Sequence, residues 1–165
     1  MQERTPVDLQ VFVDAMSRLA NGVNVVTTAS DSGRDGVTVS SACSVTAQPP
    51  SVLACIHHES RAAEAIEHCG VLCLNVLGVD QSGISDAFAR RVDGLEDRFS
   101  RGEWHTLVTG SPVLVGAVAS FDCMVEHMLT EGTHKIFIAK VVAAVHCDAD
   151  PLLYSRRRYA KINWA

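Results

Sequence analysis

The sequence has 165 residues, of which 47% are hydrophobic and 20% charged, with a formal net charge of -5 and a pI of about 5.7. The length predicts one domain over residues 1–165, and the acidic balance argues against a nucleic-acid binder. No apolar run approaches the roughly 20 residues that cross a bilayer, and the charged start lacks a secretory signal. We therefore expect a cytoplasmic protein with no membrane partner.

The first predicted element is an amphipathic helix. Apolar residues between Leu9 and Ala20 recur at the spacing of one helical face, which predicts a buried stripe. Thr5, Pro6 and Asp8 suit the start of a helix, and Asn21-Gly22 suits its end.

Strands dominate the chain that follows. A polar, glycine-containing connection separates Val23–Ala29 from Gly36–Thr46, which predicts a hairpin whose second strand ends at Pro49-Pro50. The next expected elements are a strand over 51–57, a short helix over Ser60–His68, a buried strand over Val71–Leu77 and a helix over Asp80–Arg91.

The last third of the sequence is predicted to contain a second hairpin. Residues 92–112 are mostly irregular, strands over 112–129 and 134–147 follow, and the tail from Pro151 is basic and aromatic. Because strands and helices do not alternate regularly, the order favours a mainly β fold, an antiparallel barrel with a few covering helices.

Common catalytic and metal-binding motifs are missing. The sequence has no G-x-G-x-x-G, no G-x-x-x-x-G-K-[ST] and no G-x-S-x-G. The six cysteines form no C-x-x-C pair, and most lie in apolar runs, so we expect free, buried thiols in a reducing compartment. A metal set drawn from His57, His58, Cys69 and Cys73 matches no familiar spacing, and no metal is expected.

The stretch from Gly36 to Thr46 is unusual for a core strand. In one continuous strand, small side chains would share one face, four of them hydroxylated: Thr38, Ser40, Ala42, Ser44 and Thr46. Such a face buries little apolar area. The stretch is therefore either an edge strand with a polar outer face or a shelf for a flat, polar ligand.

Two neighbouring features favour the shelf. Ser60 and Arg61 stand at a predicted helix start, where free N–H groups, the helix dipole and a guanidinium favour a phosphate. Asn75 lies alone in an apolar run, as a buried amide that needs partners.

These segments together resemble the short-chain flavin reductases, the reductase components of two-component flavin-dependent monooxygenases. The resemblance runs from about Phe12 to Tyr159 and rests on GVTVSSACSVTAQPPSVLAC, SRAAEAI with CLNVL, Arg98-Phe99, GSPVLVGAVASFDCMVEHMLTEGTHKIFIAKV and PLLYSRRRY. It implies an FMN-binding split β-barrel and a homodimer. It also implies hydride transfer from C4 of NADH or NADPH to N5 of FMN or FAD, with release of the reduced flavin to a monooxygenase partner.

The resemblance also implies site residues. His134, in the Gly132-Thr133-His134 turn, corresponds to the histidine beside the reactive ring and is the expected catalytic residue. The positions expected to bind flavin or nicotinamide are Thr38, Val39, Ser40, Ser41, Cys43, Ser44, Val45, Thr46, Ile56, His57, Ser60, Arg61, Asn75, Arg98, Tyr154, Arg156, Arg157 and Tyr159. Three positions depart from the family pattern: Ala62 for Thr, Thr133 for Asp, and Cys43 for Phe or Thr.

Three other functions stay open on the sequence alone. One is a flavin carrier or sensor without activity, and another is an oxidoreductase that keeps its flavin and reduces a different acceptor. The third is a flavin-free barrel that binds an apolar ligand.

Overall fold

The computed structural model describes residues 5–92 and 97–164. Its elements in chain order are α1 (Leu9–Met16), β1 (Asn21–Gly22), β2 (Asn24–Ser30), β3 (Gly33–Val39), β4 (Ala42–Ala47), β5 (Pro50–His57), α2 (Arg61–Cys69), β6 (Val71–Val76), α3 (Ser82–Phe88), the 3-10 turn η1 (Arg98–Ser100), β7 (Trp104–Thr106), β8 (Pro112–Leu114), β9 (Ala119–Glu131), β10 (His134–His146), β11 (Leu153–Ser155) and β12 (Arg158–Ala160). Among the described residues, no helix is long and apolar enough to span a membrane.

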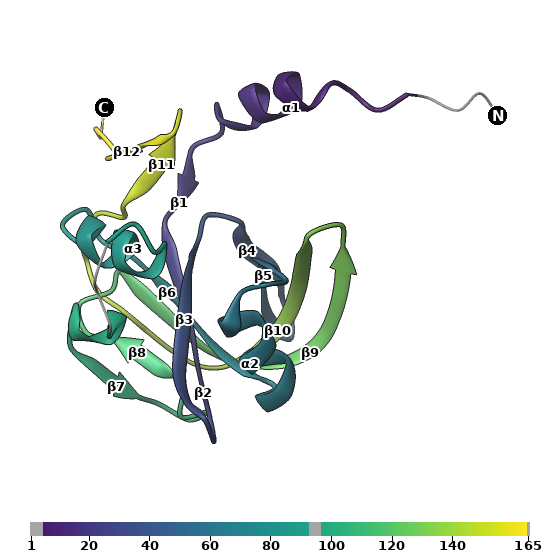
Figure 1. The fold of residues 1–165 in the computed structure, drawn as a ribbon. Coiled ribbons are helices and arrows are strands. Elements are labelled where there is room, and N and C mark those ends of the chain that lie inside the picture. Colours follow the sequence, from purple (N-terminus) through teal and green to yellow (C-terminus); the bar gives the residue numbers. More distant parts are fainter. Residues whose placement is uncertain (1–4, 93–96, 165) are drawn as a thin grey trace.

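An antiparallel seven-stranded sheet forms the body, in the order β3-β2-β6-β9-β10-β5-β4. The sheet curls so that β3 at one end contacts β5 near the other (Figure 1). Only Ser40 and Ser41 connect the two edge strands, and the Cys55 N–H donates to the Ser41 carbonyl across this link. The result is the expected mainly β, split-barrel architecture with a few covering helices.

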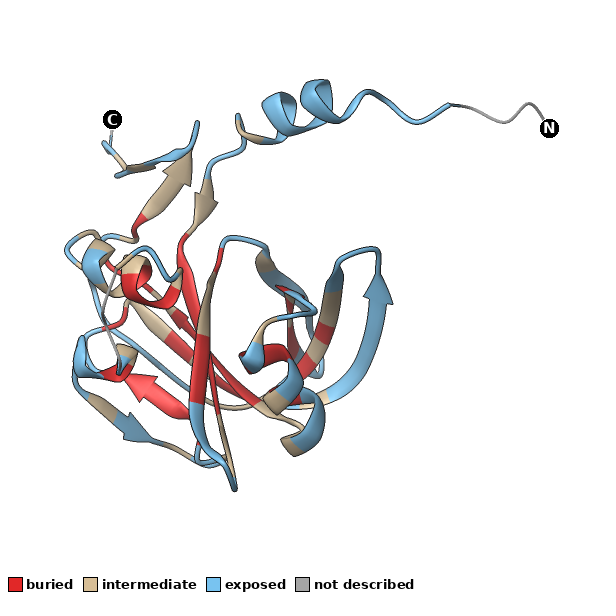
Figure 2. Cartoon of the chain, viewed as in Figure 1, coloured by how far each residue is buried: buried red, intermediate tan, exposed pale blue. Residues whose placement is uncertain are grey.

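Two apolar clusters fill the two sides of the sheet. Successive residues of β2 point to opposite faces, so Val26 packs with Ile56 and Phe137, whereas Val25 packs with Phe88. The second cluster contains an aromatic set, in which the rings of Phe88, Phe99 and Trp104 lie 5.0–5.5 Å apart. Figure 2 shows this buried interior and the exposed β9–β10 hairpin tip and α1 beyond it.

The predicted elements need three corrections. The stretch Gly36–Thr46 is two strands, β3 and β4, because the chain turns at Ser40–Ser41 and pairs with different partners on each side. The predicted strand over 112–129 is β8 and β9, separated by a turn at Gly116, whose φ is +75°. Helix 80–91 is shorter, as α3, and the segment before Pro112 contains η1 and β7.

The first helix is also different from the expectation. Asp8 caps α1 as predicted, by accepting hydrogen bonds from the N–H groups of Gln10 and Val11. However, α1 contains no buried residue and projects from the body (Figure 1), with Leu9 74% exposed and Phe12 50% exposed. The apolar stripe is present, but within one chain nothing covers it.

Candidate functional site

The junction between β3 and β4 exposes polar groups at one rim of the barrel. Residues Ser40, Ser41, Cys43, Ser44, Val45 and Thr46 are all exposed. Among the described residues, the hydroxyls of Ser40, Ser41 and Ser44 make no hydrogen bond within the chain, whereas the Thr46 hydroxyl is used in the turn to Gln48. The pairing shifts between Ser44 and Thr46, so the regular alternation expected for this face ends at a bulge.

A small pocket of about 140 Å³ lies beside this junction and brings five of the expected positions together. These are Thr38, Val39, Ser40, Tyr154 and Tyr159. The Thr38 hydroxyl donates to the Ser85 carbonyl over 2.7 Å, which fixes β3 against α3. The Tyr159 hydroxyl donates to Asp86 over 2.6 Å, and burial, followed by this bond, raises the pKa of Tyr159.

Arg61 and Arg98, both expected at the site, meet on a third residue that the sequence did not single out. Asp35 is buried, and its carboxylate accepts from the Arg98 Nη2 over 2.8 Å and pairs with the Arg61 Nε over 3.3 Å. Arg98 also donates from Nη1 to the Gly36 carbonyl, so both of its ends are held by β3. The Arg61 side chain is 75% exposed, and its two Nη groups stay available for an anion.

The start of α2 adds backbone donors beside Arg61. Ser60 is the N-cap residue, but its hydroxyl makes no capping bond. The first N–H groups of a helix have no partner within the helix, so they and the positive end of the helix dipole suit a phosphate. Ala62, which stands where the family often has Thr, is fully buried and offers no hydroxyl there.

His57 and His134 lie side by side as cross-strand partners of β5 and β10. Their rings stand edge to face with centroids 5.4 Å apart, and the His58 ring lies 5.0 Å from that of His57. The Thr133 hydroxyl is 3.0 Å from Nδ1 of His134, so Thr133 supplies a ring partner where the family has Asp. His57 accepts at Nδ1 from the Glu59 N–H, which places the proton of its neutral form on Nε2.

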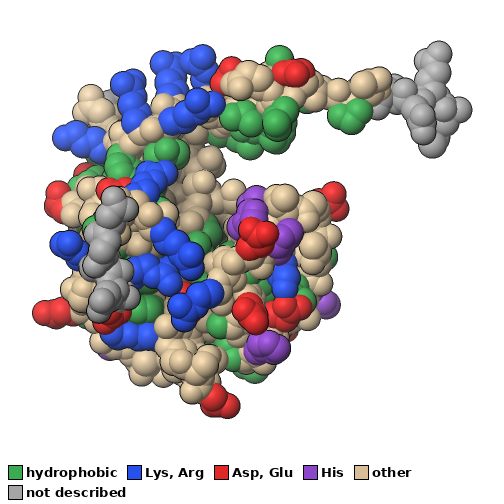
Figure 3. Space-filling view, viewed as in Figure 1, with side chains coloured by type: hydrophobic (Ala, Val, Ile, Leu, Met, Phe, Trp, Pro, Cys, Tyr) green, Lys and Arg blue, Asp and Glu red, His purple; other side chains and the backbone are tan. Residues whose placement is uncertain are grey.

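Arg156 and Arg157 form the tip of the β11–β12 hairpin. Both adopt positive φ, of +51° and +62°. The Arg156 N–H donates to the Ser17 carbonyl, and Arg157 pairs with Asp14 of α1 over 3.3 Å. Figure 3 shows most of the Lys and Arg side chains gathered over one half of this face and histidines on the other, with acidic side chains on both.

Asn75, one of the expected site residues, lies in the middle of the sheet and away from the exposed rim. It is completely buried, and its amide nitrogen donates to the Val25 carbonyl and the Thr27 hydroxyl. Its oxygen accepts from the Leu114 N–H and the Ser120 hydroxyl. Because protein groups use all of this bonding capacity, Asn75 joins β2, β6, β8 and β9 and has nothing left for a ligand. Ile56 is likewise buried in the first apolar cluster.

The cysteines are free, but they are not all buried as expected. Only Cys73 and Cys123 are buried, whereas Cys43 and Cys147 are exposed and Cys55 and Cys69 are intermediate. Within the described parts of the chain, no group of His, Cys, Asp or Glu has the arrangement of a metal site.

Comparison with known proteins identifies the family. The family description "Flavin reductase like domain" matches residues 16–163. This chain belongs to that family. The FMN reductase (NADH) RutF of Ancylobacter novellus is 40% identical over 154 residues, which cover 93% of this chain and 84% of the relative.

Solved structures of other flavin reductases have the same fold. A flavin reductase of Haemophilus somnus 129PT is 40% identical and superposes with a TM-score of 0.90 over 94% of this chain and 100% of its own. The styrene monooxygenase flavin reductase of Pseudomonas putida S12 is 28% identical, with a TM-score of 0.84 over 93% of this chain and 98% of its own.

Sequence reasoning missed four residues that contact the expected site positions or line the small pocket with them: Asp35, Ser85, Asp86 and Arg91. Asp35 stands in a polar, glycine-containing turn sequence, which reads as solvent-exposed. Only the return of α2 and η1 to this turn brings two arginines to it, and no local pattern shows that contact.

Proposed function

We propose that this chain is an NADH-dependent flavin reductase that reduces FMN and releases it to a separate flavin-dependent monooxygenase. The observation that carries the proposal is the 40% identity to an FMN reductase (NADH) along almost the whole chain. Two sets of free groups support it, namely the exposed hydroxyls of Ser40, Ser41 and Ser44 at the rim and the exposed guanidinium of Arg61 at the start of α2.

The residues fit a flavin mononucleotide. Arg61 and the first N–H groups of α2 would bind the phosphate, and the β4 rim with its hydroxyls would take the ring. A bound flavin supplies the hydride-accepting chemistry, so the protein needs no nucleophile of its own. His134, oriented by Thr133 and His57, would position the nicotinamide, with Tyr154, Tyr159 and the hairpin arginines on its other side.

The test is NADH oxidation, followed at the nicotinamide absorbance band, with and without added FMN. We expect oxidation only when flavin is present and loss of the flavin on dialysis. Yellow protein that survives extensive dialysis would favour a flavin-retaining oxidoreductase. FMN binding without NADH oxidation would favour a carrier or sensor. Colourless protein whose melting temperature does not change on addition of FMN would favour a flavin-free barrel that binds an apolar ligand.

We also propose that the chain works as a homodimer in the cytoplasm. Helix α1 has only eight residues, and isolated helices of that length are marginal in water, so its exposed apolar stripe needs a covering surface. Met124, Met128 and Leu129 are further exposed apolar side chains on β9. Six unpaired thiols suit a reducing compartment. Sedimentation of the wild type and of Phe12→Asp tests the dimer, which this substitution should weaken.

A further inference from the structure

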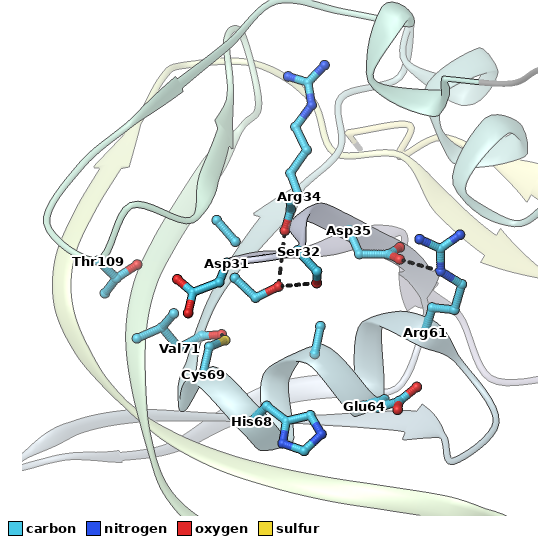
Figure 4. A pocket seen from close by; sticks show the side chains of 14 residues that line it. Asp31, Ser32, Arg34, Asp35, Arg61, Glu64, His68, Cys69, Val71 and Thr109 are labelled. Atoms are coloured by element: carbon cyan, nitrogen blue, oxygen red, sulfur yellow. Dashed lines mark hydrogen bonds and ion pairs between the residues drawn. The ribbon is translucent and has the colours of Figure 1, made fainter.

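Asp35 is a buried carboxylate on β3 that links two arginines from other parts of the chain. Its side chain is 9% exposed, its Oδ1 accepts from the Arg98 Nη2 over 2.8 Å, and its Oδ2 pairs with the Arg61 Nε over 3.3 Å. Asp35 and Arg61 also line a groove between α2 and the β2–β3 turn. Figure 4 shows the Asp35 carboxylate turned toward Arg61, whereas Arg34 of the same strand points away. The proposed function uses Arg61 but assigns no role to this carboxylate.

Arg98 is held against β3 by contacts within the chain. Its side chain is 18% exposed, its Nη1 donates to the Gly36 carbonyl over 2.7 Å, and its Nη2 donates to Asp35. Its guanidinium carbon also lies 5.6 Å from the centroid of the Phe88 ring. Arg98 therefore fixes Oδ1 of Asp35 and balances the charge of a carboxylate that would be costly to bury alone. The other carboxylate oxygen, Oδ2, remains for Arg61.

The contact with Asp35 determines which edge of the Arg61 guanidinium faces outward. A guanidinium can bind a phosphate through two parallel bonds, either from Nε and one Nη or from the two Nη groups. Because Asp35 takes the Nε, the edge formed by the two Nη groups is the one left for an anion. The Arg61 side chain is 75% exposed, and a long exposed side chain loses rotamer freedom when a ligand orders it. A contact that already holds the Nε lowers this cost of binding.

Charge alone predicts the opposite effect of Asp35. Asp35 and Arg98 form a neutral pair, so Arg61 supplies the net positive charge of the three side chains. Without the carboxylate, two positive charges would be unopposed, and their attraction would strengthen the binding of a phosphate. Orientation predicts weaker binding instead. The two explanations therefore differ in sign, and salt reduces the contribution of attraction.

We infer that Asp35 is a positioning residue for the flavin phosphate: fixed by Arg98, it holds Arg61 so that the two Nη groups meet the phosphate. The inference rests on the proposed function, because it needs the phosphate at Arg61. It also gives Arg98 a different role from the one expected from the sequence, since Arg98 acts through Asp35 and does not contact the flavin.

The experiment measures the Kd for FMN and for riboflavin by flavin fluorescence titration at about 0.15 M salt, where the Debye length is about 8 Å. Asp35→Asn keeps the shape of the side chain and should raise the Kd for FMN about three- to tenfold, while the Kd for riboflavin stays within about twofold. The KM for FMN should rise with the Kd, and kcat at saturating FMN should not change. In an Arg61→Ala background the same substitution should change the Kd for FMN by less than about twofold, because the residue that Asp35 positions is gone.

Asp97→Asn is the matched control. Asp97 also pairs with an arginine over 3.3 Å, Arg34, but both side chains are exposed. Asparagine can replace Asp97 as the N-cap of η1, so the turn that carries Arg98 should be kept. This variant should change neither Kd by more than about twofold.

Arg61→Lys keeps the inference testable if Asp35→Asn fails to fold, because the Arg61 side chain is exposed. Lysine retains the charge but has a single nitrogen, so it cannot pair with Asp35 and also offer a two-donor edge. We expect Arg61→Lys to lose most of the FMN affinity that Arg61→Ala loses.

Several results would overturn the positioning role. Tighter FMN binding by Asp35→Asn would show that its charge matters more than its hold on Arg61. Equal weakening of FMN and riboflavin, no effect on either, or the same loss of FMN affinity in the Arg61→Ala background would also contradict the role. So would wild-type FMN affinity in Arg61→Lys.

Failure of the proposed function would look different. Wild-type protein that binds riboflavin as tightly as FMN, yet oxidises NADH with FMN, would overturn the phosphate contact and the role of Asp35 while leaving the reductase activity intact. Wild-type protein that neither binds flavin nor oxidises NADH with it would overturn the proposed function itself.

Discussion

Two polar clusters of this chain differ in what satisfies their hydrogen bonds. Around Asn75, in the middle of the sheet, protein groups from four strands fill every position, and the cluster is closed to solvent. Around Arg61, at the start of α2, one buried carboxylate holds the guanidinium through Nε while the two Nη groups stay free on an exposed side chain. Polar residues in an apolar context are therefore of two kinds. Those that keep unused hydrogen-bond donors or acceptors can bind a ligand, whereas those whose groups are all bonded within the protein stabilise the fold.

The largest effect should follow from Asn75→Ala. The substitution leaves the Leu114 N–H and the Ser120 hydroxyl buried without an acceptor, at about 1–3 kcal/mol each, so the free energy of unfolding should fall by about 2–6 kcal/mol in all. Urea denaturation measures this, and FMN titration of the folded fraction is the control. A variant that kept its stability but lost FMN affinity would show that Asn75 contributes to flavin binding, and would contradict the distinction drawn between the Asn75 and Arg61 clusters.

His134→Ala should act on the rim without affecting stability. His134 is exposed, as are its ring neighbours Thr133 and His57, and a small misplacement of reacting groups can slow a reaction by about a hundredfold. We expect flavin reduction in stopped-flow experiments to slow by up to that factor, with FMN affinity preserved. The matched control is His127→Ala, an exposed histidine on β9 of the same hairpin. Normal reduction by His134→Ala would remove the catalytic role.

Arg61→Ala tests the phosphate contact. Charge-assisted hydrogen bonds contribute about 1.5–3 kcal/mol, which corresponds to a rise of roughly 10- to 100-fold in the Kd for FMN. Riboflavin, which has no phosphate, should bind the variant as well as it binds wild type, and stability should change little because the side chain is mostly exposed. Equal losses for FMN and riboflavin would mean that Arg61 shapes the rim without contacting the phosphate.

Much of this arrangement can be predicted from local sequence, and the failures have a common cause. Alternating residues around turn signals predicted the β2–β3 and β9–β10 hairpins, and good helix formers closed by Gly70 predicted α2. The division of Gly36–Thr46 was missed because small hydroxyl residues occupy both sides of the break, and only the pairing partners differ. The apolar stripe on α1 indicates that this helix packs against another surface, but the sequence of the helix does not identify that surface.

The site shows the same limit. The residues expected at the site were proposed through resemblance, and the structure brings Ser40 and Tyr159 to one small pocket and, separately, His57 beside His134. Asn75 was correctly predicted to be buried, yet its partners come from strands distant in sequence, so its use could not be read locally. Asp35 was missed for the same reason.

The buried thiols of Cys73 and Cys123 should make the stability of the protein depend on pH. Burial, followed by the Asp122 charge, raises the pKa of Cys123 to about 12, and burial also raises the pKa of Cys73. Since the folded state keeps these protons, their contribution to stability is complete below the unfolded pKa of about 8.5–9 and falls as the pH rises above it. We expect each thiol to contribute a loss of about 1–2 kcal/mol by pH 10, measured by denaturation. Cys123→Ala should flatten this dependence, and an unchanged slope would contradict it.

The smallest effect should come from the hairpin tip. Arg156→Asn with Arg157→Asn removes two exposed charges while keeping a residue that tolerates positive φ, so the backbone should hold. Exposed charges are screened, and we expect the KM for NADH to rise only a few-fold, more than the KM for FMN, with the difference shrinking in high salt. Because Arg157 also pairs with Asp14, Asp14→Asn is the control for lost anchoring of α1. If Asp14→Asn reproduced the effect, or if both KM values rose equally, the arginines would hold α1 and would not guide the nicotinamide phosphates.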